Sequence, residues 1–298
     1  TYAMKTTTEL GLNANQSIAF DPIIQALRLN DDAAAAFSAL SSQFDFFDAY
    51  ADLMPTYATA STELAATAIQ QSQSATTNRM AHTRLVGLNE VSVWAQEIAY
   101  GLSREPPSAN GQEFRGSGFG LAAGIDGPLD NGAMFGLSAS FLASEAEEPG
   151  RPEGEISTWF AQGNAYLGTA VGPVDLDFVV GGGFGRMQSR RFIQIGPSFN
   201  ARTDAEWNAY EGHGAARASV PLAVSDWFIV TPQAALTYIY LAEDGYTEEG
   251  GGAAFDMEAD STASQRLWAD AGVEFSARWQ MRSGGFISPR LYAGYRAN

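Results

Sequence analysis

Charged side chains recur at every second position in several stretches of the sequence, opposite the apolar residues. Alternation of this kind places the charged set on one face of a β-sheet and the apolar set on the other. The candidates are Asp175, Asp177, Glu211, His213, Arg217, Arg266, Asp270, Glu274, Arg278, Arg290 and Arg296. The favoured interpretation is that opposite charges on neighbouring strands pair and neutralise a hydrated interior. The alternative is that these groups grip a helix inside that interior and gate a tunnel.

A second set of candidates lies in a long upstream segment of small residues, from about 57 to 85. Most of its residues are Ala, Ser, Thr or Gln, and its apolar positions recur near helical spacing. The polar candidates on this helix are Glu63, Asn78, Arg79 and Arg84. Small neutral side chains suit a helix that sits inside a polar tunnel. A solvated linker helix is the alternative.

Familiar catalytic and cofactor motifs do not occur in the sequence. It has no cysteine, and its two histidines, His82 and His213, show no metal-ligand spacing. A Gly-x-Ser-x-Gly nucleophile motif is absent, and the glycines at 181–185 are not followed by the Lys-Ser/Thr of a phosphate loop. We therefore expect no enzymatic activity, no cofactor and no metal site.

The overall charge excludes another class of partner. The formal net charge is -17 at pH 7, which repels phosphate groups. Nucleic acid is therefore not an expected partner.

The elements that would position the candidate charges begin near residue 88, where period-two alternation replaces helical spacing. About nine alternating stretches follow. They lie near 91–103, 114–127, 132–145, 155–171, 174–192, 203–222, 227–242, 262–281 and 286–297. Their connections alternate between short turns, as at 127–131 and 171–173, and long polar loops at 145–155, 197–204 and 243–260.

This layout predicts an all-β transmembrane β-barrel. Apolar faces carrying aromatic residues near the strand ends, with short turns at one rim and long loops at the other, are typical of outer-membrane barrels. A soluble β-sandwich also alternates. Several stretches exceed the usual sandwich strand of about six residues, however, and carry charges in mid-strand. A wide barrel with a wet interior accommodates such charges, so the barrel is favoured.

Several segments resemble the translocator of autotransporters, the type V secretion proteins. The resembling segments are Val93-Trp94-Ala95-Gln96, residues 118–126, Trp227-x-x-Val230-x-Pro232-Gln233-Ala234-x-Leu236-x-Tyr238, residues 244–248 and residues 288–296. Residues 12–16 and 58–84 are similar to the linker that precedes these barrels. The order and spacing of the segments carry the resemblance, since no single motif is exclusive to the family.

The resemblance implies a barrel of about twelve strands with an α-helix running through its pore. We accordingly predict a helical linker at 1–56 after a passenger, a pore-spanning helix at 57–88 and an outer-membrane barrel at 89–298. Nine visible strands fall short of twelve, so we expect further C-terminal strands and an upstream passenger beyond the given sequence.

The function implied by the resemblance is export of an N-terminal passenger to the surface of a Gram-negative cell. The barrel would anchor in outer-membrane lipid and act as a conduit, with surface-exposed loops. Its expected partners are its own passenger, the barrel-assembly machinery and periplasmic chaperones. Two alternatives stay open: a passive porin-like pore, and a surface adhesin that acts through its acidic extracellular loops.

The resemblance also raises one chemical possibility at Asn78. Certain relatives release their passenger by cleavage at an asparagine inside the pore, where paired asparagines occur and a proton acceptor is near. This chain has Thr77-Asn78 instead, which disfavours cleavage. Asp175, Asp177 or Glu211 would be the candidate acceptors.

Overall fold

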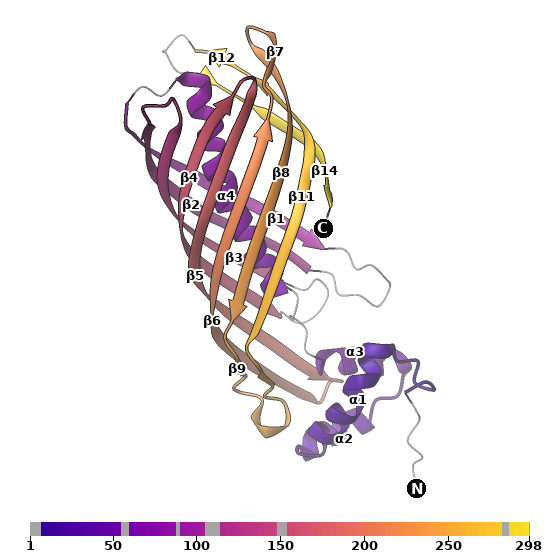
Figure 1. The fold of residues 1–298 in the computed structure, drawn as a ribbon. Coiled ribbons are helices and arrows are strands. Elements are labelled where there is room, and N and C mark those ends of the chain that lie inside the picture. The colour runs from indigo at the N-terminus through magenta and orange to yellow at the C-terminus, as the bar shows by residue number, and fades with distance from the viewer. Residues whose placement is uncertain are drawn as a thin grey trace.

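A computed structural model describes residues 7–54, 60–87, 90–104, 114–147, 154–281 and 286–297. A long, curled antiparallel sheet dominates it, and one helix lies along the concave side of that sheet (Figure 1). Three shorter helices gather beyond one end of the sheet (Figure 1).

Nine long strands follow one another in the sheet in chain order, each antiparallel to the next. They are β1 (Ser92–Arg104), β2 (Phe114–Pro128), β3 (Met134–Glu147), β4 (Glu155–Val171), β5 (Val174–Ile195), β6 (Phe199–Ser219), β8 (Phe228–Glu243), β11 (Thr262–Ala277) and β14 (Arg290–Ala297). The described strands form a curled half-barrel with β1 and β14 at its two ends. The predicted all-β fold with about nine strands after residue 88 is confirmed.

The two faces of the sheet have the reverse of the usual soluble pattern. Large apolar side chains on the convex face are exposed, among them Phe119, Leu137, Phe141, Val180, Phe184, Leu236 and Leu267. Polar side chains on the concave face are buried, among them Ser138, Ser140, Gln162, Asn164, Asp177, Glu211 and His213. An apolar exterior around a polar interior is the pattern of a transmembrane barrel.

The loop prediction at 197–204 is wrong. β5 continues to Ile195 and β6 already begins at Phe199, so the two strands form one long hairpin with Gly196 at its tip in the left-handed conformation (φ 56°). The three outward positions of β5 that follow Phe184 carry Arg186, Gln188 and Arg190 instead of apolar residues. The amphipathic signal therefore stops where the hairpin leaves the apolar band, although the strand pairing continues.

The stretch predicted at 262–281 is divided in the structure. β11 ends at Ala277, and the next strand, β12 (Trp279–Gln280), pairs with β13 (Phe286–Ile287) in a separate two-stranded sheet. The short strand β7 (Leu222–Ser225) pairs only with β8. A second small sheet joins β9 (Tyr246–Thr247) to β10 (Glu258–Ala259), and a 3₁₀ turn, η1 (Gly252–Ala254), lies between them.

Three short helices precede the sheet, and each begins at a residue suited to capping. Helix α1 (Ala14–Leu27) begins with a capping box between Asn13 and Gln16, and α2 (Asp31–Ser38) is capped by Asn30. Helix α3 (Gln43–Asp52) is capped by Ser42.

The long helix α4 (Ala60–Val86) lies against the concave face of the sheet. At 1.5 Å per residue its 27 residues extend about 40 Å. Of the predicted helix at 57–88, residues 57–59 and 88 lie outside the described residues. Within the described part of the chain, no helix combines the length and apolarity needed to cross a membrane.

Candidate functional site

Helix α4 packs closely against one wall of the sheet, formed mainly by β3 and β4. Small or slender side chains on this side of the helix are completely or almost completely buried: Leu64, Ala65, Ala68, Ile69, Ser72, Ala75, Thr76 and Met80. Larger side chains would hold the two backbones apart. The small residues that the sequence shows in this segment therefore let the helix approach the wall.

Hydroxyl and amide groups join the middle of α4 to this wall. The Ser72 and Ser140 hydroxyls lie 2.7 Å apart, and those of Thr76 and Ser138 lie 3.3 Å apart. The Asn164 amide donates to the Ser72 hydroxyl at 3.1 Å. Each buried polar group of α4 named here thus finds a partner on the sheet.

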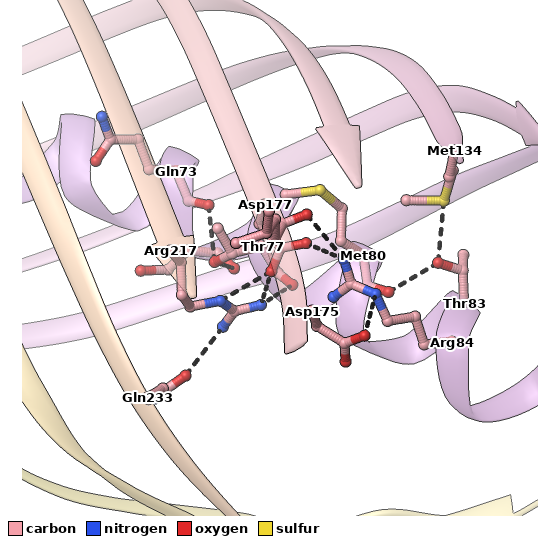
Figure 2. A network of polar contacts seen from close by, with 12 residues as sticks. Gln73, Thr77, Met80, Thr83, Arg84, Met134, Asp175, Asp177, Arg217 and Gln233 are labelled. Carbon is pink, nitrogen blue, oxygen red and sulfur yellow. Dashed lines mark hydrogen bonds and ion pairs between the residues drawn. The ribbon is translucent and has the colours of Figure 1, made fainter. Parts of the chain in front are cut away.

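Asp177 on β5 lies at the centre of an ion-pair cluster near the C-terminal end of α4 (Figure 2). Its carboxylate is fully buried and accepts hydrogen bonds from Arg84 of α4 and from Arg217 of β6, the latter at 2.9 and 2.5 Å. Arg84 also lies 3.7 Å from Asp175. Arg217 additionally donates to the Thr77 carbonyl of α4 at 3.3 Å. Three predicted interior charges and one predicted helix charge therefore meet here.

A second ion pair joins α4 to β2. Arg79 donates to both carboxylate oxygens of Asp126, from Nε and Nη2, each at 2.7 Å. The hydroxyl of Tyr166 donates to the same carboxylate at 2.8 Å, and Ser92 does so at 3.0 Å. Trp94 in turn donates to the Tyr166 hydroxyl at 2.8 Å. The Asp126 side chain is fully buried, so its charge is balanced by this guanidinium and these donors.

A third ion pair holds the first turn of α4. Arg266 on β11 donates to both carboxylate oxygens of Glu63, at 3.1 and 2.7 Å. Both side chains are about one third exposed, so water screens this pair more than the other two. Glu63 near the N-terminus and Arg84 near the C-terminus also complement the helix dipole.

Glu211 and His213 pair with each other on β6, and both side chains are fully buried. His213 Nδ1 lies 2.7 Å from Glu211 Oε2, and Nε2 lies 2.7 Å from the Asn164 Oδ1 atom. A Cβ atom at Gly181 would come within 2.6 Å of both the Asn164 and His213 side chains. Gly181, and likewise Gly183 beside Glu211 and Gln162, therefore makes room for interior side chains of the neighbouring strands.

The remaining predicted charges lie toward β11 and β14. Arg296 pairs with Asp270 at 2.7 Å and also contacts the side-chain amide of Gln70 on α4. Arg290 and Glu274 line a cavity of about 610 Å³ between α4, β1 and β14. The Arg278 backbone amide donates to the Trp227 carbonyl at 2.8 Å, beyond the end of β11.

The predicted acceptors are not the groups that share a cavity with Asn78. The Asn78 side chain is exposed and lines the same cavity as His82 and Glu274. Asp177 is instead bound by two arginines, and Glu211 by His213. This arrangement gives no support to cleavage at Asn78.

Sequence reasoning missed the acidic partner of Arg79. Asp126 is a lone acid near the end of β2, after interior positions occupied by Ala122 and Gly124, so no repeated charge pattern marks it. Asp126 could have been placed from its spacing alone, because it follows Ala122 and Gly124 at every second position and so lies on the same face of the strand.

The arrangement can hold a helix in a fixed position along the sheet. Ion pairs act near both ends of α4, and hydroxyl contacts act in the middle. In the described part of the chain, no group of three His, Asp or Glu side chains is arranged to hold a metal ion.

Comparison with known proteins agrees with this architecture. The family model for the autotransporter beta-domain matches residues 93–298. The translocator domain of autotransporter NalP from Neisseria meningitidis superposes with a TM-score of 0.60 at 16% identity, covering 74% of this chain and 72% of that one. The beta domain of the Bordetella autotransporter BrkA gives a TM-score of 0.49 at 14% identity, covering 70% of this chain and 80% of that one. No match was found among curated proteins.

Proposed function

The chain belongs to the autotransporter beta-domain family, and on that premise we propose that it exports and anchors an N-terminal passenger at the surface of a Gram-negative cell. The half-barrel would lie in the outer membrane, and α4 would be the last part of the exported segment. The chain would act as a conduit and anchor, with no catalytic step.

The observation that carries this proposal is the seating of α4 on the concave face. The helix lies along the wall formed by β3 and β4 and is bound by Glu63–Arg266, Arg79–Asp126 and Arg84–Asp177. A segment held in this way remains inside the barrel after the residues before it have passed through. We therefore propose a helical linker at 1–56, a pore helix at 57–88 and a barrel at 89–298.

The direction of α4 supports export toward the long-loop end. Its first turns pack near Ile156 and Trp207, on the side of the long β5–β6 hairpin. Its later residue Met80 packs against Met134 and Tyr166, on the side of the short β2–β3 turn. In outer-membrane barrels the longer loops are extracellular and the short turns periplasmic. The N-terminal end of α4 would then face the cell exterior, where a passenger belongs.

The same helix disfavours a passive pore as the main function. A pore of that kind needs an open interior, whereas α4 fills the space beside β3 and β4. An adhesin acting through its acidic loops is compatible with export and requires a loop-binding partner. The barrel-assembly machinery and periplasmic chaperones remain part of the proposal as the partners that a barrel of this type needs to reach the membrane.

The proposal is tested by placing an epitope before Thr1 and producing the full chain in a Gram-negative host. The epitope should be labelled by antibody on intact cells and lost after external protease treatment, while the barrel stays in the outer-membrane fraction. A matched chain that lacks residues 60–86 should insert without displaying the epitope. An inserted wild-type chain whose epitope stays inside the cell would falsify the export function.

A further inference from the structure

The long-loop end of the sheet carries an apolar surface on its concave side that α4 does not cover. Along β5 the interior positions near the short-turn end are Asp175, Asp177, Val179 and Gly181. Toward the hairpin tip the same face carries Ile193 and Ile195, which are almost completely buried. Apolar interior residues that lie beyond the end of α4 need another partner to cover them.

Helices α1, α2 and α3 supply that cover (Figure 1). One apolar cluster joins residues of all three helices to the hairpin and to the segment between β8 and β11. Its buried members are Ile23, Leu27, Ala33, Ala36, Ala49, Tyr50, Leu53, Ile193, Ile195 and Phe255. Phe199 at the start of β6 packs against Phe255 with ring centroids 5.5 Å apart.

Arg191 ties the three parts of this contact together. Its guanidinium, only 4% exposed, binds both carboxylate oxygens of Glu248 at 3.2 and 2.5 Å. It also donates to the Phe255 carbonyl at 2.8 Å and to the Asp52 carbonyl, at the end of α3, at 3.3 Å. The Asp52 carboxylate in turn accepts a hydrogen bond from the Gln194 backbone amide at 3.3 Å. One buried cation on β5 thus satisfies the C-terminal end of α3 and the β8–β11 segment.

The connection to α4 makes this contact relevant to export. Seven residues separate Asp52 from Ala60, so the chain between their Cα atoms reaches at most about 29 Å. Helix α3 can therefore bind Arg191 only when the N-terminal end of α4 lies at the long-loop end. The ion pairs of α4 and the contact at Arg191 involve different residues, so each can be broken separately.

We propose that the long-loop end is a docking surface for the chain's own α1–α3 unit, and that this docking latches the exported segment at the outer face. This inference rests on the proposed export function. The latch is formed by the hairpin, the β8–β11 segment and α3. It holds residues just after the passenger rigidly on the barrel, instead of leaving them on a mobile linker.

Spin labelling can test the latch, because the chain contains no cysteine that would compete for the label. Labels at Ser38→Cys on α2 and Ser261→Cys before β11 occupy exposed positions. In the purified full chain in detergent, pulsed EPR should give one narrow distance distribution. Arg191→Met should convert it into a broad one, since loss of one partner leaves Glu248 buried without its cation.

Arg190→Met is the matched control. Arg190 is the sequence neighbour of Arg191, but its side chain points outward, is half-exposed and pairs with Glu155 and Asp204. It should keep the narrow distribution. From the helix side, Ala36→Glu places a charge in the buried cluster, whereas Ala35→Glu on the same helix is exposed. Only Ala36→Glu should broaden the distribution, and it leaves every strand unaltered.

The outcomes separate the latch from export. A broad distribution in the wild type, or a narrow one in both Arg191→Met and Ala36→Glu, overturns the latch. If the N-terminal epitope still reaches the surface in that case, export stands without it. If the epitope fails to reach the surface, the export function falls and the latch loses its role with it.

Discussion

Arg79 of α4 and Asp126 of β2 bind each other through two parallel hydrogen bonds of 2.7 Å, with the carboxylate fully buried. They are 47 residues apart in sequence, and the pair fixes the rotation of α4 as well as its height along the sheet. A guanidinium fork that meets a carboxylate edge has little freedom to turn or slide.

Replacing Arg79 by Met should lower the free energy of unfolding by about 3–5 kcal/mol, because the Asp126 charge stays buried without its cation. Arg79→Lys should recover only part of the loss, since an ammonium lacks the planar two-pronged geometry. Urea unfolding in detergent, followed by tryptophan fluorescence, measures the effect. Arg296→Met is the control, because its pair with Asp270 is more exposed and should contribute about 0–1 kcal/mol. If Arg79→Met and Arg296→Met lower the free energy of unfolding equally, Arg79 has no special role in holding α4 against the sheet.

Asp177→Asn should loosen the C-terminal end of α4, because two arginines would then face a neutral amide. In planar bilayers we expect transient conductance openings to become on the order of a hundredfold more frequent, the change that about 3 kcal/mol produces. Asp175→Asn provides a close comparison, since this side chain lies 3.7 Å from Arg84 and is partly exposed. Its opening frequency should stay near that of the wild type. Similar behaviour of the two variants would argue against a special role for Asp177.

Ser72→Leu should disturb the seating of α4, because Ser72 is fully buried against Ser140 and Asn164. Extra side-chain volume in such a contact costs about 1–3 kcal/mol. The variant should lose its folded, heat-modifiable form on gels at a lower temperature than the wild type. Ser74→Leu changes a neighbouring, half-buried serine in the same way and should have little effect. An unchanged temperature for Ser72→Leu would mean that the helix does not pack as described.

High pH should release the α1–α3 unit. Burial raises the pKa of Tyr50 to about 12, and its hydroxyl donates to the Gln16 carbonyl. The folded protein favours the neutral form of the Tyr50 phenol. The stability that this preference contributes is therefore complete below about pH 10 and is lost as the pH rises toward 12. EPR line shapes of a label at Ser38→Cys should therefore become mobile above about pH 10. In Tyr50→Phe this pH-dependent step should be absent.

The sequence was most informative where a repeated pattern reports on a repeated environment. Outward residues such as Val180 and Phe184, alternating with small or polar inward residues, identify a strand between lipid and a wet interior. The Ala, Ser and Thr content of α4 likewise indicates a helix in close contact with its surroundings. These features depend on neighbours along the chain, which a single sequence displays.

The specific partners could not be predicted because they depend on strand register and on contacts distant in sequence. Glu63 and Arg266 are 203 residues apart, and nothing near either one identifies the other. The sequence predicted that Arg217 pairs with an acid on a neighbouring strand without identifying that acid, which is Asp177 on β5. The start of β6, from Phe199 to Asp204, was assigned to a loop because a strand beyond the apolar band no longer shows amphipathic alternation.

The length of the β5–β6 hairpin decides how a passenger would be presented. From Arg186 to Ile195, β5 extends about 30 Å beyond Phe184. The α1–α3 unit rests on this extension, to one side of the sheet, as Figure 1 shows. Anything attached upstream would consequently start off-axis, at a set height above the bilayer and with a set azimuth. In a crowded membrane, the direction in which each copy presents its passenger would then be set by the orientation of its own barrel.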